Sequence, residues 1–266
     1  RKITVEITAS SVSFDKLPHI LLEFKQIDQQ KQISAEAFQQ QQWESARDLI
    51  RGLAHEIKNP LGGLRGAAQL LNKELTDDQQ EYTQMIIEQA DRLSTLVDRL
   101  LGPNQLPKMS QQNIHVVLEK VSKLISFNNP KNIKLIKDYD PSIPDIEFDE
   151  DKLHQAILNI VNNAVQVIDE AGHITLKTRI ASNQTINGKR VKLSVQISIL
   201  DNGPGIPAHL QDTLFYPMVS GRVNGTGLGL SISQTLINQH QGKLSCISRP
   251  GRTEFIILLP ISEEKT

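Results

Sequence analysis

The sequence contains one cysteine, few aromatic residues and no long apolar run. Cys246 alone excludes an internal disulfide and a metal site built from several cysteines. The apolar stretches are short and interrupted by charges, so none approaches the roughly 20 residues that cross a bilayer. Lys and Arg (29) balance Asp and Glu (30), which gives no reason to expect direct nucleic-acid binding. We therefore expect a cytoplasmic protein that neither spans a membrane nor binds nucleic acid directly.

The 266 residues suffice for about two domains, and 38% of them are hydrophobic. The opening RKITVEITASSV alternates as a strand does, and LPHILLEFKQID, residues 17–28, predicts a second strand. Because the chain starts without an initiator Met or a signal-peptide pattern, we expect residues 1–28 to be the last hairpin of an upstream sheet domain. The Gln-rich residues 29–42 are predicted to link this remnant to the next element.

Residues 49–71 have the apolar spacing of an amphipathic helix. At about 100° per residue, His55 falls nearly opposite the apolar stripe, which predicts that its imidazole faces solvent. Asn59 lies one turn further on the same side, and Glu56 is turned partly around the helix. Read alone, HEIKN could be an ordinary solvated helix face. The stripe consists of Leu49, Ile50, Leu53, Ile57, Leu61, Leu64, Ala68 and Leu71.

A second amphipathic segment follows TDDQQ and ends at Gly102-Pro103, which stops a helix. The two helices would form a hairpin in which each helix has one apolar stripe. Because a lone hairpin buries too little of these stripes, we predict that two copies associate into a four-helix bundle. In such a bundle His55 points outward.

Residues 151–168 predict a third amphipathic helix, with an unusual polar stripe of Lys152, Asn159, Asn163 and Gln166. Asn is a poor residue for a helix interior, because its side chain competes for backbone hydrogen bonds. An amide oxygen can ligate Mg²⁺, which usually takes few protein ligands together with phosphate oxygens. The apolar stripe of this helix consists of Leu153, Ile157, Ile160, Val161, Ala164 and Ile168.

Two strand-like runs, HITLKTRIA and KRVKLSVQISIL, are joined through Asn187-Gly188, a strong hairpin signal. The second run ends at Asp201, where Gly203 and Gly205 allow the backbone to turn tightly. The Asp201 carboxylate could therefore accept a hydrogen bond from an exocyclic amine such as that of adenine. Taken alone, DxGxG could be only a turn.

The segment NGTGLGLSI places Gly225, Gly227 and Gly229 at the start of a helix that runs to about Gln241. Glycines at a helix N-terminus leave backbone amides bare for a phosphate, and the helix dipole favours negative charge there. A single GxGxG motif is a weak signal. The order of Asn-rich helix, strand, DxGxG, aromatic loop and GxGxG helix is a strong one.

At this point the motifs match a family. NIVNNA, DNGPGI, LFYP and GTGLGL resemble the N, G1, F and G2 boxes of the ATP-binding domain that sensor histidine kinases share with gyrase, Hsp90 and MutL type ATPases. HEIKNP resembles the H box of the dimerising phosphoacceptor domain of these kinases. Over residues 44–262 the chain is similar to the nitrogen-regulation (NtrB) type, through HEIKNPLGGLRGAAQLL and DTLFYPMVSGR, and residues 1–28 fit the end of a PAS sensor domain.

The resemblance implies a multi-domain fold. An all-α helical hairpin that forms a dimeric four-helix bundle precedes an α/β two-layer sandwich ATP-binding domain of the Bergerat or GHKL type. The resemblance implies a PAS-like remnant at residues 1–28 and a linker at 29–42. The dimerisation and phosphoacceptor domain follows at 43–104, a hinge at 105–110, and the catalytic domain at 111–266.

The resemblance also assigns roles to single residues. His55 is the phosphoacceptor, Glu56 orients or deprotonates its ring, and Asn59 holds water for dephosphorylating the partner. Asn163 ligates Mg²⁺, with Asn159 nearby on the same helix face. The remaining assignments concern ATP. Asp201 binds the adenine amino group, and Gly203 and Gly205 shape the pocket around it. Phe215 lies in a mobile lid over about 206–224, and the phosphates are bound by Gly225, Gly227 and Gly229.

One position departs from the family pattern. Many relatives have Lys or Arg one turn after the Mg²⁺ asparagine, whereas this chain has Gln166. Positive charge for the γ-phosphate must then come from elsewhere, and Arg222 or Lys152 are the candidates. Either residue could equally be a solvated surface charge.

The resemblance implies three partners: a second copy of the chain, a response regulator of the NtrC type that accepts the phosphoryl group on an aspartate, and a PII-type signal protein. Two alternatives remain open from the sequence. The chain could be an ATPase of the same superfamily without phosphohistidine chemistry, or a degenerate kinase that only scaffolds partners.

Overall fold

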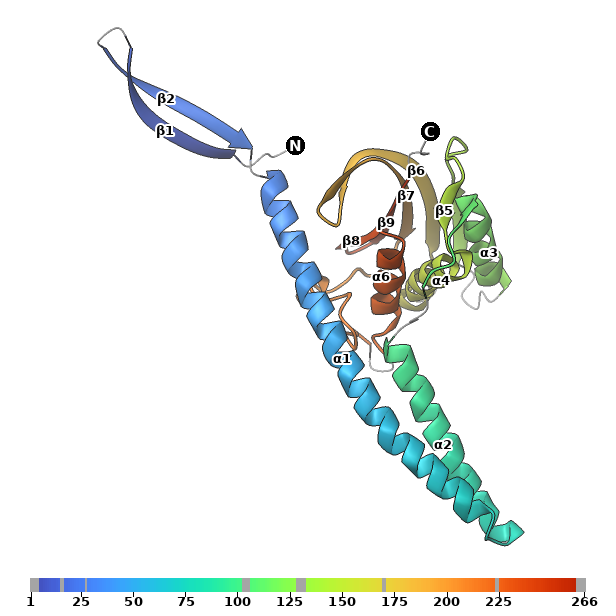
Figure 1. The fold of residues 1–266 in the computed structure, drawn as a ribbon. Helices are drawn as coiled ribbons and strands as arrows, with labels where there is room; N and C mark the ends of the chain where they lie inside the picture. The colour runs from blue at the N-terminus through green and yellow to red at the C-terminus, as the bar shows by residue number, and fades with distance from the viewer. Residues whose placement is uncertain are drawn as a thin grey trace.

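The computed structural model describes residues 5–14, 17–26, 28–101, 106–127, 133–168, 171–222 and 225–261. Along the chain follow a strand hairpin, two long helices and an α/β unit (Figure 1). Strands β1 (Val5–Phe14) and β2 (Leu17–Gln26) pair antiparallel along their whole length, which confirms the two predicted strands. In the described part of the chain, no helix is long and apolar enough to cross a membrane.

Helix α1 (Asp28–Asn72) is longer than the sequence pattern predicted. The Gln-rich residues 29–42, expected to be a separate linker, belong to the same helix as His55. Between Asp28 and Arg51 the chain contains neither glycine nor proline, and it is rich in the good helix formers Gln, Glu and Ala. The residues expected to form a linker are therefore part of one continuous helix from Asp28 onward.

Helix α2 (Asp77–Leu101) packs against α1 through a narrow seam. The residues buried in this seam recur every seven positions, which is the spacing of a coiled coil. They are Ala54, Leu61 and Ala68 on α1 and Thr83, Ala90 and Val97 on α2. Two ion pairs, Lys58 with Asp98 and Arg65 with Asp91, also join the helices.

Most large apolar side chains of the predicted stripes lie beside this seam and remain exposed. Leu64, for example, is 57% exposed, although it belongs to the apolar stripe of α1. The others are Leu49, Leu53, Ile57 and Leu71 on α1 and Ile86, Leu93 and Leu96 on α2. The hairpin confirms the two predicted helices, and by itself it leaves their apolar flank uncovered.

The α/β unit contains a five-stranded sheet of order β4-β6-β7-β9-β8. Its only parallel pair within the described residues is β4 with β6; the other neighbours are antiparallel. Asn187 and Gly188 connect β6 to β7 with positive φ angles of 49° and 74°, as in the predicted tight hairpin turn. The strands are β4 (Lys134–Asp138), β6 (His173–Ile186), β7 (Lys189–Asp201), β8 (Lys243–Arg249) and β9 (Arg252–Pro260).

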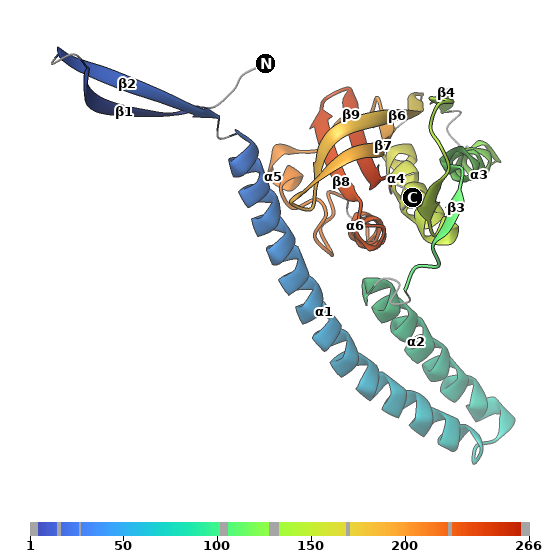
Figure 2. The same cartoon turned by 45° about the horizontal axis from the view of Figure 1, so that its top comes forward.

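Two helices, α4 (Glu150–Val167) and α6 (Gly229–Gln239), lie against this sheet and form the second layer (Figure 2). Every residue of the predicted apolar stripe of α4, from Leu153 to Ile168, is buried. The two-layer sandwich is therefore confirmed. The remaining elements are α3 (Ile114–Phe127), which packs on α4, the short α5 (Ala208–Gln211), and the pair β3 (Ser110–Gln112) and β5 (Ile146–Phe148).

Candidate nucleotide site and phosphoacceptor helix

Helices α4 and α6 are antiparallel, and the polar stripe of α4 faces α6. Near the start of α4, Lys152 Nζ donates to Gln239 Oε1 at the end of α6, at 2.8 Å. Further along, Ser233 Oγ donates to the Ala156 carbonyl at 3.0 Å, and Asn159 Nδ2 donates to the Gly229 carbonyl at 3.3 Å. The asparagine end of α4 is therefore fixed beside the N-terminus of α6, where the glycine motif lies.

This arrangement decides between the two candidate cations. Lys152 is only 8% exposed and lies at the C-terminal end of α6, about 15 Å along that helix from Gly229. It therefore lies far from the glycine motif at which the phosphates are expected. Arg222 instead donates to Asn163 Oδ1 at 2.9 Å and to Gln166 Oε1. The structure thus brings Arg222 to the side chains that sequence reasoning had assigned to the site.

Asp201 lies at the end of β7 and is 4% exposed. Its Oδ1 accepts a hydrogen bond from the Gly203 backbone N–H at 2.9 Å, so the carboxylate has a fixed orientation. Burial raises the pKa of Asp201 above its usual value, and the Gly203 hydrogen bond opposes this shift. An added Cβ at Gly203 would lie 2.8 Å from Asp201 Oδ1, so a side chain there would displace the carboxylate.

Two further glycines permit close backbone approach. Gly205 has a φ of +88°, and a Cβ there would lie 2.8 Å from the Arg249 carbonyl carbon. Gly227 has a φ of +65°, and a Cβ there would meet the backbone nitrogen of Val219 at 2.7 Å. Both positions exclude other residues by conformation and by space. Gly229 begins α6, and among the described residues no side chain caps this helix end.

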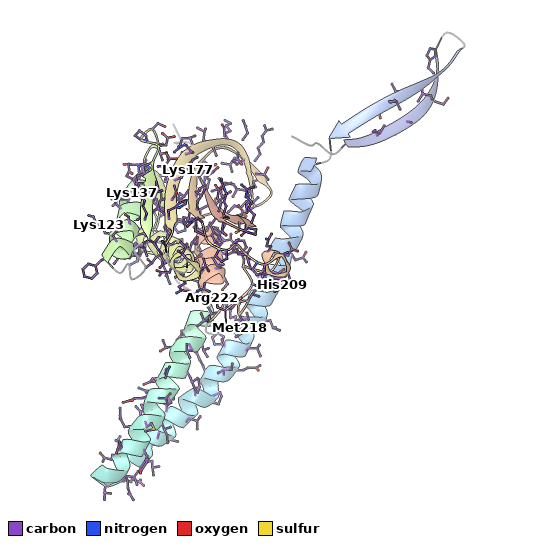
Figure 3. All side chains as sticks on the ribbon, turned by 180° about the vertical axis from the view of Figure 1, so that it is seen from behind. Lys123, Lys137, Lys177, His209, Met218 and Arg222 are labelled. Atoms are coloured by element: carbon purple, nitrogen blue, oxygen red, sulfur yellow. The ribbon has the colours of Figure 1, made fainter. Side chains whose placement is uncertain are left out.

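The segment between α5 and α6 carries Met218 and Arg222 (Figure 3). Phe215, expected in a mobile lid, packs against the hydrophobic core of the sandwich, next to the buried Leu214. This part of the expected lid therefore contacts the core of the domain, and its mobility stays a prediction. Beyond it, the Met218 N–H donates to the Gly227 carbonyl at 3.1 Å and ties this segment to the glycine motif. Of the expected lid residues, 223 and 224 lie outside the described residues.

On the helical hairpin, the structure places His55, Glu56 and Asn59 on the exposed surface of α1. The neighbouring Ala54 is 2% exposed and faces α2. His55 therefore projects away from the seam, as the helical periodicity predicted. The H-box and ATP-site residues belong to two separate structural units of the chain.

Sequence reasoning missed a buried polar connection at the base of α4. The Asp149 carboxylate accepts hydrogen bonds from the backbone N–H groups of Lys108, at 2.6 Å, and Lys152, at 3.1 Å. The Asp149 N–H donates to His240 Nε2 at 3.0 Å, and His240 Nδ1 donates to the Leu236 carbonyl at 2.7 Å. Asp149 immediately before an amphipathic helix is an N-cap signal that could have been read. Nothing in the sequence pairs it with His240.

The residues present fit a magnesium nucleotide. The half-buried Asn163 offers an amide oxygen, which Mg²⁺ accepts as a ligand, beside the bare N-terminus of α6. In the described part of the chain, no cluster of three or more His, Cys, Asp or Glu side chains could hold a metal ion. A metal here would therefore depend on amide and phosphate oxygens.

Comparison with known proteins agrees with this geometry. Residues 148–263 match the family of histidine kinase-, DNA gyrase B- and HSP90-like ATPases, and residues 45–107 match the His kinase A phosphoacceptor domain. The sensory histidine kinase/phosphatase NtrB of Vibrio alginolyticus is 55% identical over 98% of this chain and 75% of its own length. NtrB of Klebsiella oxytoca is 57% identical over 94% of this chain and 73% of its own length.

Among solved structures, full-length ShkA in complex with AMPPNP superposes with a TM-score of 0.55. It is 27% identical, and the match covers 82% of this chain and 47% of ShkA. A phosphoacceptor hairpin joined to this type of ATPase domain defines a histidine kinase. Within that class, the chain belongs to the NtrB family of sensory histidine kinase/phosphatases.

Proposed function

We propose that this chain autophosphorylates His55 from Mg-ATP, transfers the phosphoryl group to an aspartate of a response regulator, and also dephosphorylates that regulator. The observation that carries the proposal is the placement of His55. It is exposed on α1, beside a seam that buries Ala54, so both an ATP-bearing domain and a regulator can approach it. Membership of the NtrB family supports both activities.

In the nucleotide site, the Asp201 carboxylate would accept a hydrogen bond from the adenine amine, with Gly203 and Gly205 shaping the pocket. The bare amides at the start of α6, with Gly225, Gly227 and Gly229, would receive the phosphates. Asn163 would hold Mg²⁺, with Asn159 fixing the neighbouring Gly229 carbonyl. Bound Mg²⁺ would neutralise charge on the phosphate oxygens.

The chemistry of His55 starts from its exposed imidazole, because attack on phosphorus uses the lone pair of a ring nitrogen. A ring nitrogen attacks the γ-phosphorus, an N–P bond forms, and the bond from this phosphorus to the bridging oxygen breaks, so that ADP leaves. The other ring nitrogen gives up its proton to Glu56, which also fixes the ring orientation. When a regulator carboxylate attacks the same phosphorus, the N–P bond breaks and the ring recovers a proton.

The apolar flank of the hairpin supports a homodimer. Large side chains such as Leu64 and Ile86 are 57% and 48% exposed. A contiguous apolar flank of this kind marks an interface, and the heptad seam beside it fits a four-helix bundle. A second copy of the same hairpin covers the flank with like side chains.

Other parts of the proposal rest on the family alone. The regulator is of the NtrC type, a PII-type protein sets the balance between kinase and phosphatase, and the protein acts in the cytoplasm. Asn59, exposed one turn after His55, orients the water that dephosphorylates the regulator. The β1–β2 hairpin is the end of a PAS-like sensor domain, residues 43–104 are the phosphoacceptor domain, 105–110 the hinge and 111–266 the catalytic domain.

The decisive experiment incubates the chain with γ-labelled ATP and Mg²⁺. We expect acid-labile, alkali-stable label on His55 in the wild type, none in His55→Gln, and wild-type labelling in the matched control His173→Gln, which changes another exposed histidine. ATP hydrolysis without label would indicate an ATPase lacking phosphohistidine chemistry. Failure to bind ATP would indicate a scaffold.

A further inference from the structure

Arg222 joins two amide side chains that lie one helical turn apart on α4. Its Nη2 donates to Asn163 Oδ1 at 2.9 Å, and its Nη1 donates to Gln166 Oε1. Residues three apart on a helix face the same side, so one planar guanidinium can reach both oxygens. Arg222 therefore contacts the oxygen that the proposed function assigns to Mg²⁺.

Two cations cannot share this oxygen at low cost. Mg²⁺ binds oxygen at about 2.1 Å, and the Arg222 nitrogen lies 2.9 Å from Asn163 Oδ1. The two positive charges would then lie within about 5 Å of each other, where their repulsion is considerable near a protein surface. Binding of Mg²⁺ to Asn163 therefore requires that the Arg222 guanidinium leave.

We propose, on the basis of the proposed function, that Asn163, Gln166 and Arg222 form a latch that Mg²⁺ must open. Gln166 is the positioning residue of this latch, because its neutral amide accepts the second hydrogen bond of Arg222. A Lys or Arg at position 166 has no acceptor and could not hold the guanidinium. When the latch opens, the released Arg222 side chain is free to meet the γ-phosphate.

The backbone around Arg222 supports a movement of the side chain alone. The Arg222 N–H donates to Ser220 Oγ at 3.1 Å, and Ser220 Oγ donates to the Arg222 carbonyl at 3.1 Å. The Met218 N–H also holds the segment to the Gly227 carbonyl. These bonds fix where the side chain starts, while the exposed guanidinium can rotate away from α4.

The latch makes a prediction that separates it from a simple phosphate contact. ADP has no γ-phosphate for Arg222 to meet, so with Mg-ADP the residue acts only as a competitor of Mg²⁺. Without Mg²⁺, ADP does not need Asn163 Oδ1, and the competition disappears. The quantity to follow is the ratio of the ADP dissociation constant in EDTA to that in saturating Mg²⁺.

The test measures ADP binding to the full chain by titration calorimetry, in EDTA and in Mg²⁺. We expect the Mg²⁺ enhancement ratio to rise about three- to tenfold in Arg222→Ala and about threefold in Gln166→Met, since each variant removes exposed hydrogen bonds of modest strength. Gln166→Met changes no charge, so a rise there reports the hydrogen bond rather than long-range attraction. The matched control Gln155→Met, at an exposed position of α4, should leave the ratio unchanged.

Three results would overturn the latch: an unchanged ratio in Arg222→Ala, a reduced ratio in that variant, or a rise in Arg222→Ala without one in Gln166→Met. If the wild-type chain binds no ADP under either condition, the proposed function fails first, and the latch fails with it. Binding that is normal in the wild type and insensitive to all three substitutions overturns the latch alone.

Discussion

The helical hairpin and the α/β unit bury their apolar side chains to very different extents. In the α/β unit, Ile157, Ile160, Ile197 and Ile199 are fully buried within one core. In the hairpin, the described buried positions are mostly small residues of the seam, while residues such as Leu64 remain more than half exposed. The α/β unit thus buries its apolar side chains within one chain, whereas the described part of the hairpin leaves an apolar flank exposed.

This difference bears on how the kinase can be regulated. The contacts that fix the candidate nucleotide residues, between α4 and α6, lie within the α/β unit. In the proposed homodimer, the environment of His55 depends on a bundle whose second half comes from another chain. Substitutions in the hairpin should therefore leave nucleotide affinity largely intact, and substitutions at the nucleotide site should leave the association of two hairpins largely intact.

Introducing carboxylates on the apolar flank of the hairpin is the change with the largest expected effect. We expect Leu64→Glu combined with Leu71→Glu to raise the dimer dissociation constant more than about a hundredfold, because carboxylates would be buried without partners. Sedimentation equilibrium measures this constant. Mg-ADP affinity should stay within about twofold of the wild type, and Gln69→Glu, on the opposite side of α1, should remain dimeric. A dimer unaffected by the double substitution would contradict the proposed interface.

Asp201→Asn is the reciprocal change. The Gly203 N–H already binds Oδ1 of the carboxylate, so an amide would have to offer its NH₂ group to the adenine amine. We expect ATP affinity to fall about 30- to 100-fold, as for a buried polar group left unpaired. Calorimetry of AMPPNP binding measures the loss, and Asp145→Asn, at an exposed position of the same unit, serves as control. A dimer weakened by Asp201→Asn would mean that the two units are not independent.

Asn59→Ala should separate the two activities that meet at the hairpin. We expect regulator dephosphorylation to fall about tenfold, because the water loses its orienting side chain, while autophosphorylation changes less than about twofold. Both rates are measured with labelled phosphate, in parallel with Gln69→Ala. An equal loss of both rates would exclude a role in water placement alone.

The smallest expected effect concerns the pH dependence of the stability of the α/β unit. Burial lowers the pKa of His240, which stays neutral while Nε2 accepts from the Asp149 N–H. The unfolded chain therefore binds a proton near pH 6.5 that the folded chain does not, so stability is complete above this pH and decreases as the pH falls. We expect a loss of about 1 kcal/mol between pH 7 and pH 5.

Urea unfolding at the two pH values measures this loss, with His240→Gln and the control His154→Gln in parallel. The pH dependence should become shallower in His240→Gln and stay unchanged in the control. An identical slope in the wild type and in His240→Gln would assign the acid sensitivity to other groups.

Periodic segments were predicted well from the sequence, and elements with weaker signals were missed. The stripe of α4 is buried as expected, and the Asn187-Gly188 turn forms as expected. Helix α3 was not predicted, although Ile114, Val117, Leu118 and Val121 have helical spacing and are buried. The parallel pairing of β4 with β6 was also missed, because a pairing between distant segments leaves no local pattern.

The sequence by itself determined the class of protein and the chemistry of its motifs. Short-range backbone and helix geometry is enough to predict glycines at tight turns, asparagines on one polar stripe of a helix and a histidine on an exposed helix face. Only the tertiary structure showed which of the two candidate cations lies beside Asn163. Lys152 and Arg222 were both candidates from the sequence, and the opposed directions of α4 and α6 place Lys152 at the far end and Arg222 beside Asn163. Such a choice depends on contacts between residues 59 and 87 positions apart, which local periodicity cannot encode.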